Sequence, residues 1–173
     1  ERAEKAGIAT AAIDHRDFDG RAPFEDALHA ELTRAGVELV CLAGFMRLLT
    51  EQFVERWFDR MINIHPSLLP SYKGLHTHER VLEDGVRFTG CTVHFVRPAM
   101  DAGPIIVQAA VPVLPGDTAD TLAARVLTAE HRSYPPALRL VAGGYTAITG
   151  QTVEIGDGSA PDGIWLNPDD GQS

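Results

Sequence analysis

The stretch INIHPSLLPSYKGLHTHER, residues 62–80, decides the fold, because within it a short apolar run ends in an Asn and a His. Alternate residues of a strand point to the same face, so Asn63 and His65 point one way and their Ile neighbours the other. Pro66 ends the strand, since proline has no N–H to donate to a neighbouring strand. A strand that only fills a core does not need this polar pair at its end.

Strands and helices alternate on both sides of this stretch. We predict strands at 8–14, 37–44, 61–65, 89–96 and 103–114, and helices at 21–36, 50–58, 76–85 and from 117 onward. The run 37–44 is continuously apolar, as in a buried parallel strand. Asp117 is the predicted N-cap of the last helix, and Pro135 and Pro136 predict that it bends or breaks. The alternation predicts an α/β fold, with an open, mostly parallel twisted sheet and helices on both faces.

The composition is that of an ordinary globular chain, with 173 residues, 45% of them apolar and 23% charged. We expect a catalytic domain over 1–145, and a short strand pair and polar tail over 146–173. The last fifteen residues have the composition of a disordered linker. The net charge of −9 argues against a nucleic-acid partner. With no apolar run of about 20 residues and no visible signal peptide, we expect no membrane partner and a cytoplasmic location.

The cysteines and the remaining histidines indicate no metal site. Cys41 and Cys91 lie within apolar runs and outside any metal-binding spacing, which predicts buried free thiols. His76 and His78 are two residues apart at a helix start, so they do not share a helix face. A metal site that includes His94 stays an alternative to the polar pocket lining that we favour, and we expect no metal.

A catalytic interpretation of Asn63 and His65 follows from their chemistry. A His can serve as a general acid, and an Asn amide can donate to an oxygen that becomes negative in a transition state. Asp101, in the segment RPAMDAGP, is the candidate carboxylate that orients the imidazole. Each residue by itself is also explained as a structural histidine or a turn-forming Asp. Their joint placement near strand ends, where α/β sheets bind ligands, favours an enzyme with acid–base chemistry at a carbonyl.

Several further motifs extend this interpretation to a family. With AGFMR, NIHPSLLP, GLHTH, TVHFV, D-x-GPII-x-Q and EHxxYP in this order, the sequence resembles the folate-dependent formyltransferases, from residue 1 to about 145. It is most similar to the branch that acts in purine synthesis. The resemblance implies a Rossmann-like formyltransferase fold. It also implies transfer of the formyl group of 10-formyltetrahydrofolate, as co-substrate, to the amine of glycinamide ribonucleotide.

The resemblance also implies roles for individual residues. Asn63 and protonated His65 would stabilise the oxyanion, while Asp101 would keep His65 charged and would help to move the proton of the attacking amine. The folate-binding residues would be Phe45, Met46, Arg47, Leu48, Leu49, Val96, Arg97, Met100 and Asp101. Pro66 and Glu130 would contact the nucleotide substrate. Without the resemblance, the apolar members of these sets are explained equally well as core residues, and Glu130 as a solvated helix residue.

One feature of the family has no counterpart here, and it leaves alternatives open. The family opens with a strand and a Gly-Ser-Asn-type loop that holds the substrate phosphate at a helix N-terminus, so we expect N-terminal residues to be missing from this sequence. The alternatives are a 10-formyltetrahydrofolate deformylase and a catalytically silent folate-binding subunit. A methionyl-tRNA formyltransferase would need a basic RNA-binding domain. The expected partners are small molecules, and both a monomer and a homodimer are compatible with the sequence.

Overall fold

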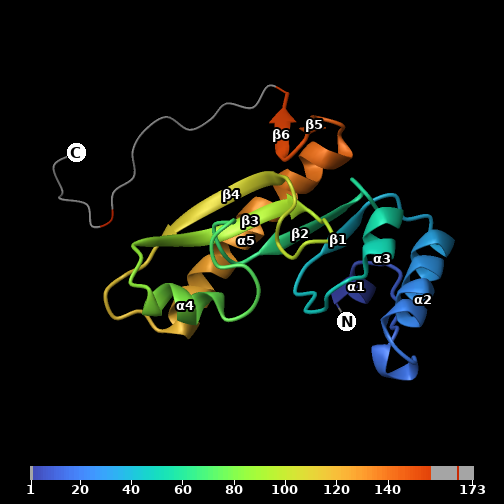
Figure 1. Cartoon of the computed structure of the whole chain (residues 1–173), viewed down its shortest axis with the longest axis horizontal. Helices are drawn as coiled ribbons and strands as arrows, with labels where there is room; N and C mark the ends of the chain where they lie inside the picture. The colour runs from blue at the N-terminus through green and yellow to red at the C-terminus, as the bar shows by residue number, and fades with distance from the viewer. Residues whose placement is uncertain (1, 157–166, 168–173) are drawn as a thin grey trace.

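The computed structural model describes residues 2–156 and residue 167. In chain order its elements are α1 (Arg2–Lys5), η1 (His15–Asp17), α2 (Arg21–Arg34), β1 (Val40–Leu42), α3 (Glu51–Arg56), β2 (Met61–His65), α4 (Thr77–Glu83), β3 (Phe88–Phe95), β4 (Ile105–Pro112), α5 (Ala119–Ala142), β5 (Thr146–Thr149) and β6 (Thr152–Ile155). The strands form one open sheet (Figure 1). The predicted α/β class is confirmed.

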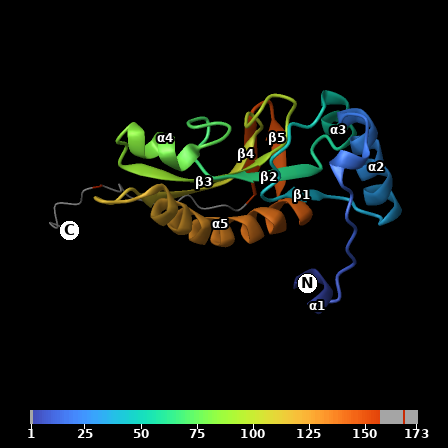
Figure 2. The same ribbon diagram turned by 90° about the horizontal axis from the view of Figure 1, so that it is seen from below.

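The sheet is mixed, in the strand order β1-β2-β3-β4-β6-β5. The pairs β1–β2 and β4–β6 are parallel, whereas β3 runs antiparallel to both β2 and β4. Helix α5 covers one face of the sheet (Figure 2), and α2 and α3 pack on the other face, against Met61 of β2, so helices lie on both faces as predicted. Helix α4 packs against α5 through Val81. The expected strand pair after residue 145 is the hairpin β5–β6, which extends the sheet beyond β4. The domain boundary at 145 stays a prediction, and most of the predicted disordered tail lies outside the described residues.

Strand β2 is held by apolar packing on the α5 face of the sheet. Ile62 is fully buried in a cluster with Phe95 and with Ala137 of α5. Because side chains alternate along a strand, Asn63 and His65 are turned toward the face opposite α5, the face on which Met61 packs against α3. A second cluster joins α2 and α3 to the start of β2; its members are Phe53, Val54, Trp57 and Met61, with Leu28 and Leu32 against them. The sequence of β2 thus fixes which face receives its polar side chains.

The predicted strand at 8–14 is wrong. These residues have no regular secondary structure, and Ile8 is 61% exposed. A strand forms when a neighbour satisfies its N–H and C=O groups, and within the described residues no strand pairs with 8–14. The apolar alternation of this segment is therefore insufficient by itself to produce a strand.

The buried strand predicted at 37–44 is also corrected. Strand β1 spans only Val40–Leu42, and its residues are half-buried or exposed. Cys41 is exposed, contrary to the prediction, whereas Cys91 is buried as expected. The reason is the position of β1 at an edge of the described sheet, where β2 covers it on one side only.

Helix α5 continues through Pro135 and Pro136, so the predicted break is absent. Each proline removes one backbone donor, and local contacts support the same turns. Ser133 Oγ donates to the Ala129 carbonyl at 2.8 Å, and Ala137 is fully buried.

The start of α5 differs from the prediction as well. Thr118, and not Asp117, is the N-cap, and it forms a capping box with Thr121. Asp117 instead accepts hydrogen bonds from the Leu114 N–H and from the guanidinium of Arg125.

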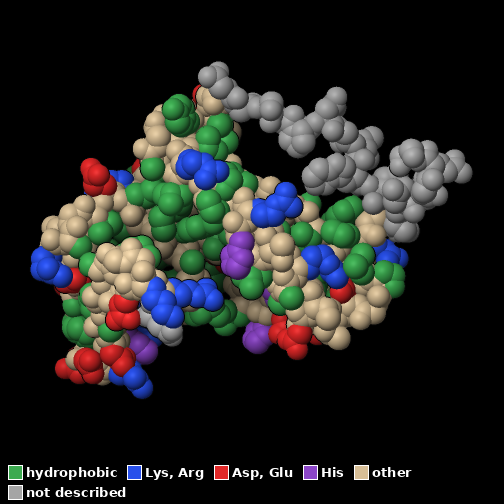
Figure 3. Space-filling view, turned by 180° about the vertical axis from the view of Figure 1, so that it is seen from behind, with side chains coloured by type: hydrophobic (Ala, Val, Ile, Leu, Met, Phe, Trp, Pro, Cys, Tyr) green, Lys and Arg blue, Asp and Glu red, His purple; other side chains and the backbone are tan. Residues whose placement is uncertain are grey.

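The outer surface of the α5 side is partly apolar. Leu127 and Leu138 of α5 and Tyr145 just beyond it are exposed. Figure 3, the view from behind, shows hydrophobic side chains at the surface of this side. The apolar character of α5 is nevertheless too limited for a bilayer: among the described residues, no helix combines the length and hydrophobicity needed to cross a membrane.

Candidate active site

The polar end of β2 meets the loop between β3 and β4. Nδ1 of His65 lies 3.4 Å from Oδ2 of Asp101, and both side chains are almost buried, with 8% and 12% exposed. Nε2 of the same ring lies 2.8 Å from the carbonyl oxygen of Tyr72. Both neighbours are acceptors, so the ring can donate to both only when both of its nitrogens carry a proton. The ring of His65 therefore lies between two acceptor groups, one at each nitrogen.

Asp101 is held in place by its backbone as well as by His65. Its φ of 48° lies in the left-handed region, which non-glycine residues adopt infrequently. Oδ2 accepts the N–H of Gly74 at 2.8 Å. The carboxylate thus joins the loop that precedes α4 to the imidazole of His65.

Asn63 faces a histidine of the next strand. The antiparallel register pairs Asn63 with His94, and Asn63 Nδ2 lies 3.4 Å from His94 Nε2. The other ring nitrogen of His94 lies 2.9 Å from the Phe95 carbonyl oxygen. Burial lowers the pKa of His94, against the opposing effects of this carbonyl and of Asp101. Sequence reasoning placed His94 only in a pocket lining, because the β2–β3 pairing that sets it opposite Asn63 is not a local signal.

Hydrogen bonds to β3 and β4 hold the turn that follows β2. Thr92 Oγ1 donates to the Ser67 carbonyl and accepts the Leu69 N–H. Gln108 donates to the Leu69 carbonyl at 2.9 Å. Pro66, predicted to contact the nucleotide, lies within this braced turn, directly after His65.

Glu130 lies on α5. Its side chain is half-buried, and burial raises its pKa, while His131 and His65 lower it. Glu130 has no hydrogen bond or ion pair with His65 among the contacts of the described residues, so its place in the site stays a prediction. The structure brings together four of the predicted residues: Asn63, His65, Pro66 and Asp101.

The predicted folate residues that follow β1 divide into two sets. Met46 and Leu48 are 73% and 59% exposed, so their apolar surfaces are accessible to a ligand. Leu49 packs against the cluster around α3, and the guanidinium of Arg47 lies over the Phe24 ring, 5.7 Å from its centroid. Phe45 is half-buried.

The predicted folate residues between β3 and β4 divide similarly. Val96 packs against the cluster around α3. Arg97 pairs with Asp59, at 2.6 Å, and covers the ring of Phe58. Met100 is half-exposed and lies beside Gly74, next to the loop that Asp101 holds.

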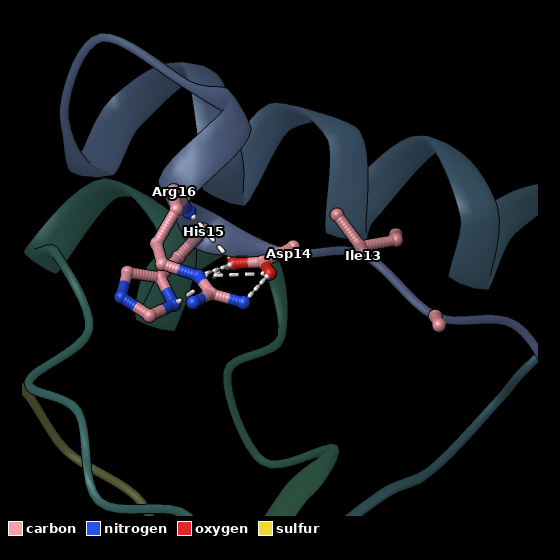
Figure 4. Close-up of a pocket in the computed structure, with 5 residues that line it drawn as sticks. Ile13, Asp14, His15 and Arg16 are labelled. Atoms are coloured by element: carbon pink, nitrogen blue, oxygen red, sulfur yellow. Dashed lines mark hydrogen bonds and ion pairs between the residues drawn. The ribbon is translucent and has the colours of Figure 1, made fainter.

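A separate hollow is lined by residues 12–16, before α2 (Figure 4). Within it, the backbone N–H and the guanidinium of Arg16 both donate to the carboxylate of Asp14. This pairing occupies the charged groups of the hollow, which is remote in sequence from the Asn63 region, so it carries no functional argument. The part of the chain that the structure describes contains no group of three or more His, Cys, Asp or Glu side chains placed to hold a metal ion.

An amide, an imidazole and a carboxylate that meet at a strand end of an α/β sheet define an enzyme of the acid–base class, suited to chemistry at a carbonyl group. The chain belongs to the formyl transferase family, whose model matches residues 1–138.

Two curated relatives share this region. One is the trifunctional purine biosynthetic protein adenosine-3 of Gallus gallus, 57% identical over 147 residues, which are 85% of this chain. The chain spans only 15% of the length of that relative. The other is the phosphoribosylglycinamide formyltransferase of Escherichia coli K12, 47% identical over 83% of this chain and 68% of that protein.

Solved structures share the fold. The crystal structure of glycinamide ribonucleotide transformylase 1 from Symbiobacterium toebii is 49% identical, with a TM-score of 0.88, over 90% of this chain and 74% of that one. A formyltetrahydrofolate deformylase from Pseudomonas syringae is 25% identical, with a TM-score of 0.83, over 90% of this chain and 52% of that one. The expected resemblance to the formyltransferases is confirmed.

Proposed function

We propose that this chain is the catalytic domain of a glycinamide ribonucleotide formyltransferase, which passes the formyl group of 10-formyltetrahydrofolate to the substrate amine in purine synthesis. The observation that carries the proposal is the meeting of Asn63, His65 and Asp101 at the end of β2. The names of the curated relatives support this acceptor.

The three side chains have distinct roles in the proposed reaction. Asn63 and the imidazolium of His65 donate hydrogen bonds to the formyl oxygen as negative charge develops on it. For this, Nε2 of His65 exchanges the Tyr72 carbonyl oxygen for the formyl oxygen of the bound substrate. Asp101, 3.4 Å from Nδ1 of His65, favours the charged ring by its own negative charge. The same carboxylate helps to move the proton that the attacking amine loses.

The exposed apolar side chains fit a reduced folate. Met46, Leu48 and Met100 present apolar surface, and a flat heterocycle is bound by such surface together with backbone polar groups. Phe45, Arg47 and Leu49 support this wall, and the segment Val96–Asp101, which includes Arg97, supplies the backbone groups. Bound 10-formyltetrahydrofolate supplies the formyl carbon that the amine attacks. Pro66 and Glu130 bind the nucleotide, with the Glu130 carboxylate directed to its ribose or amine.

The test follows tetrahydrofolate release from 10-formyltetrahydrofolate by the purified protein, with and without glycinamide ribonucleotide. We expect release that needs the nucleotide and that is abolished by His65→Ala. His15→Ala is the matched control, because His15 lies in η1 with 45% of its side chain exposed, and we expect it to keep full activity.

Two results would contradict the proposal. Release without the nucleotide would make water the acceptor and would favour a deformylase. Folate binding without release in either mixture would favour a catalytically silent folate-binding subunit. The cytoplasmic location and the choice between a monomer and a homodimer stay predictions.

A further inference from the structure

The His94 ring has an acceptor at one nitrogen and a donor at the other. Nδ1 lies 2.9 Å from the Phe95 carbonyl oxygen, which can only accept, so Nδ1 carries a proton. In the neutral ring Nε2 then has a free lone pair. That nitrogen lies 3.4 Å from Asn63 Nδ2, whose N–H groups can only donate. The two contacts are consistent with a single tautomer, and the side chain is 3% exposed.

Burial supports the neutral form of this ring. It is the largest influence on the pKa of His94 and lowers it, and the charges of His65 and Lys73 lower it further. Asp101 raises it, but the nearest carboxylate oxygen is 3.9 Å from Nε2, beyond hydrogen-bond distance. Nε2 is therefore left as an acceptor for Asn63.

The direction of the Asn63 amide matters for the proposed chemistry. An amide flip exchanges the NH2 group for the carbonyl oxygen, so the flipped group would present an acceptor where a donor is needed. It would also set the amide oxygen against the lone pair of His94 Nε2, which is repulsive. The contact with His94 therefore favours one amide orientation over the other.

We propose that His94 is a positioning residue: its Nδ1–H tautomer, held by the Phe95 carbonyl, orients the Asn63 amide so that its second N–H is available to the reacting oxygen. The inference rests on the proposed role of Asn63 in formyl transfer. His94 itself does not touch the substrate in this arrangement.

The first test needs no activity. In protein labelled with ¹⁵N at histidine, two-bond NMR correlations distinguish the two neutral tautomers and the imidazolium. We expect neutral His94 with the proton on Nδ1 at pH 7, and an altered Nε2 resonance in Asn63→Ala. A proton on Nε2 at pH 7 would overturn the proposal. So would an Nε2 chemical shift that is the same in the wild type and in Asn63→Ala.

The second test is a double-mutant cycle on formyl transfer. We expect His94→Leu to lower kcat by about tenfold with little change in KM, and by no more than Asn63→Ala does, because an indirect effect cannot exceed the loss of the donor. His94→Gln should retain most of the activity, since its amide oxygen can accept from Asn63. In the Asn63→Ala background, His94→Leu should have no further effect; an equal loss in both backgrounds would contradict the proposal.

Controls distinguish the role of His94 in orienting Asn63 from a loss of packing in β3, and from a failure of the proposed function. Val93→Ala removes buried apolar volume from the other face of β3, so it should lower the melting temperature and leave kcat unchanged. If His94→Leu does not fold, the NMR test on the wild type and Asn63→Ala still tests the tautomer of His94 and its contact with Asn63. An inactive wild-type protein with the expected tautomer would contradict the proposed function alone, whereas an active protein with the other tautomer would contradict only the role of His94.

Discussion

Oδ2 of Asp101 lies 3.4 Å from Nδ1 of His65 and also accepts the backbone N–H of Gly74 at 2.8 Å. One carboxylate oxygen therefore serves both the imidazole and the loop before α4. A change at Asp101 should affect the charge of the site and the order of that loop together.

Asp101→Asn should lower kcat by about a hundredfold, or about 2.7 kcal/mol of transition-state stabilisation, because a neutral amide gives no charge support to the imidazolium. Steady-state formyl transfer measures this effect. Asp14→Asn is the matched control, since Asp14 pairs with Arg16 at the exposed η1, and its kcat should equal that of the wild type. An Asp101→Asn enzyme with wild-type kcat would remove Asp101 from the mechanism.

Asn63→Ala should reduce kcat by roughly a hundredfold, because the loss of one donor to a developing oxyanion costs about 3 kcal/mol. The binding of 10-formyltetrahydrofolate, measured by calorimetry, should change little. Asn167→Ala is the control, since Asn167 donates to the carbonyls of Arg87 and Val113 away from the site. Weaker folate binding with normal kcat would assign Asn63 to binding instead of catalysis.

Gly103→Ala should destabilise the fold by about 3 kcal/mol. A Cβ at Gly103 would lie 1.7 Å from the Phe95 carbonyl oxygen, which also accepts from His94, so the loop must shift. Urea unfolding measures the change. Gly156→Ala, whose Cβ would meet no atom within 4 Å, should stay within about 0.5 kcal/mol of the wild type. Equal stabilities of the two variants would show that the loop between β3 and β4 can shift to accommodate the added Cβ at no measurable cost in stability.

Asp117→Asn should destabilise the protein at pH 7 and progressively less in acid. The Arg125 guanidinium and then the Leu114 N–H hold the pKa of Asp117 below its usual 3.8. A lowered pKa contributes stability above the unfolded value, and this contribution is lost as the pH falls toward the folded value. The difference in melting temperature between wild type and variant should therefore be constant from pH 7 to about pH 5, and should shrink only as the pH falls below 3.8. A difference that stays constant below pH 3.8 as well would exclude the ion pair as the cause; Asp120→Asn, in the first turn of α5, is the control.

Glu130→Gln should have the opposite effect on stability. Burial raises the pKa of Glu130 above its usual 4.5, so the ionised group disfavours the folded state once the pH rises above that range. The variant should melt higher than the wild type at pH 7, and the difference should vanish near pH 4. If Glu130 binds the nucleotide, KM for glycinamide ribonucleotide should rise in the same variant. A lower melting temperature at pH 7 would show that the carboxylate is stabilised by its surroundings.

Local spacing was sufficient to predict most elements and to single out Asn63 and His65 as candidate site residues. The period of 2 in MINIH placed Asn63 and His65 on one face, and the structure has them there. The ends predicted for α2 and α4, at residues 36 and 85, lie two residues beyond the observed ends, Arg34 and Glu83. These predictions succeeded because the decisive interactions lie within a few residues of each other along the chain.

Predictions that depended on remote partners failed or were incomplete. The segment 8–14 has strand-like spacing and yet no described neighbour to pair with, and Cys41 is exposed because β1 is an edge strand. The break expected at Pro135 and Pro136 is absent because packing at Ala137 supports the helix. Propensity sets a preference, which tertiary contacts can override.

The sequence by itself determined which residues could perform the chemistry, since the side chains of Asn63, His65 and Asp101 have fixed donor and acceptor groups. Only the tertiary structure decided how these groups meet. The antiparallel pairing of β2 with β3 sets His94 against Asn63, and the left-handed turn at Asp101 brings its carboxylate to His65. The physical reason is that hydrogen bonds between strands and the packing of loops join residues far apart in the chain, and no local pattern specifies those pairs.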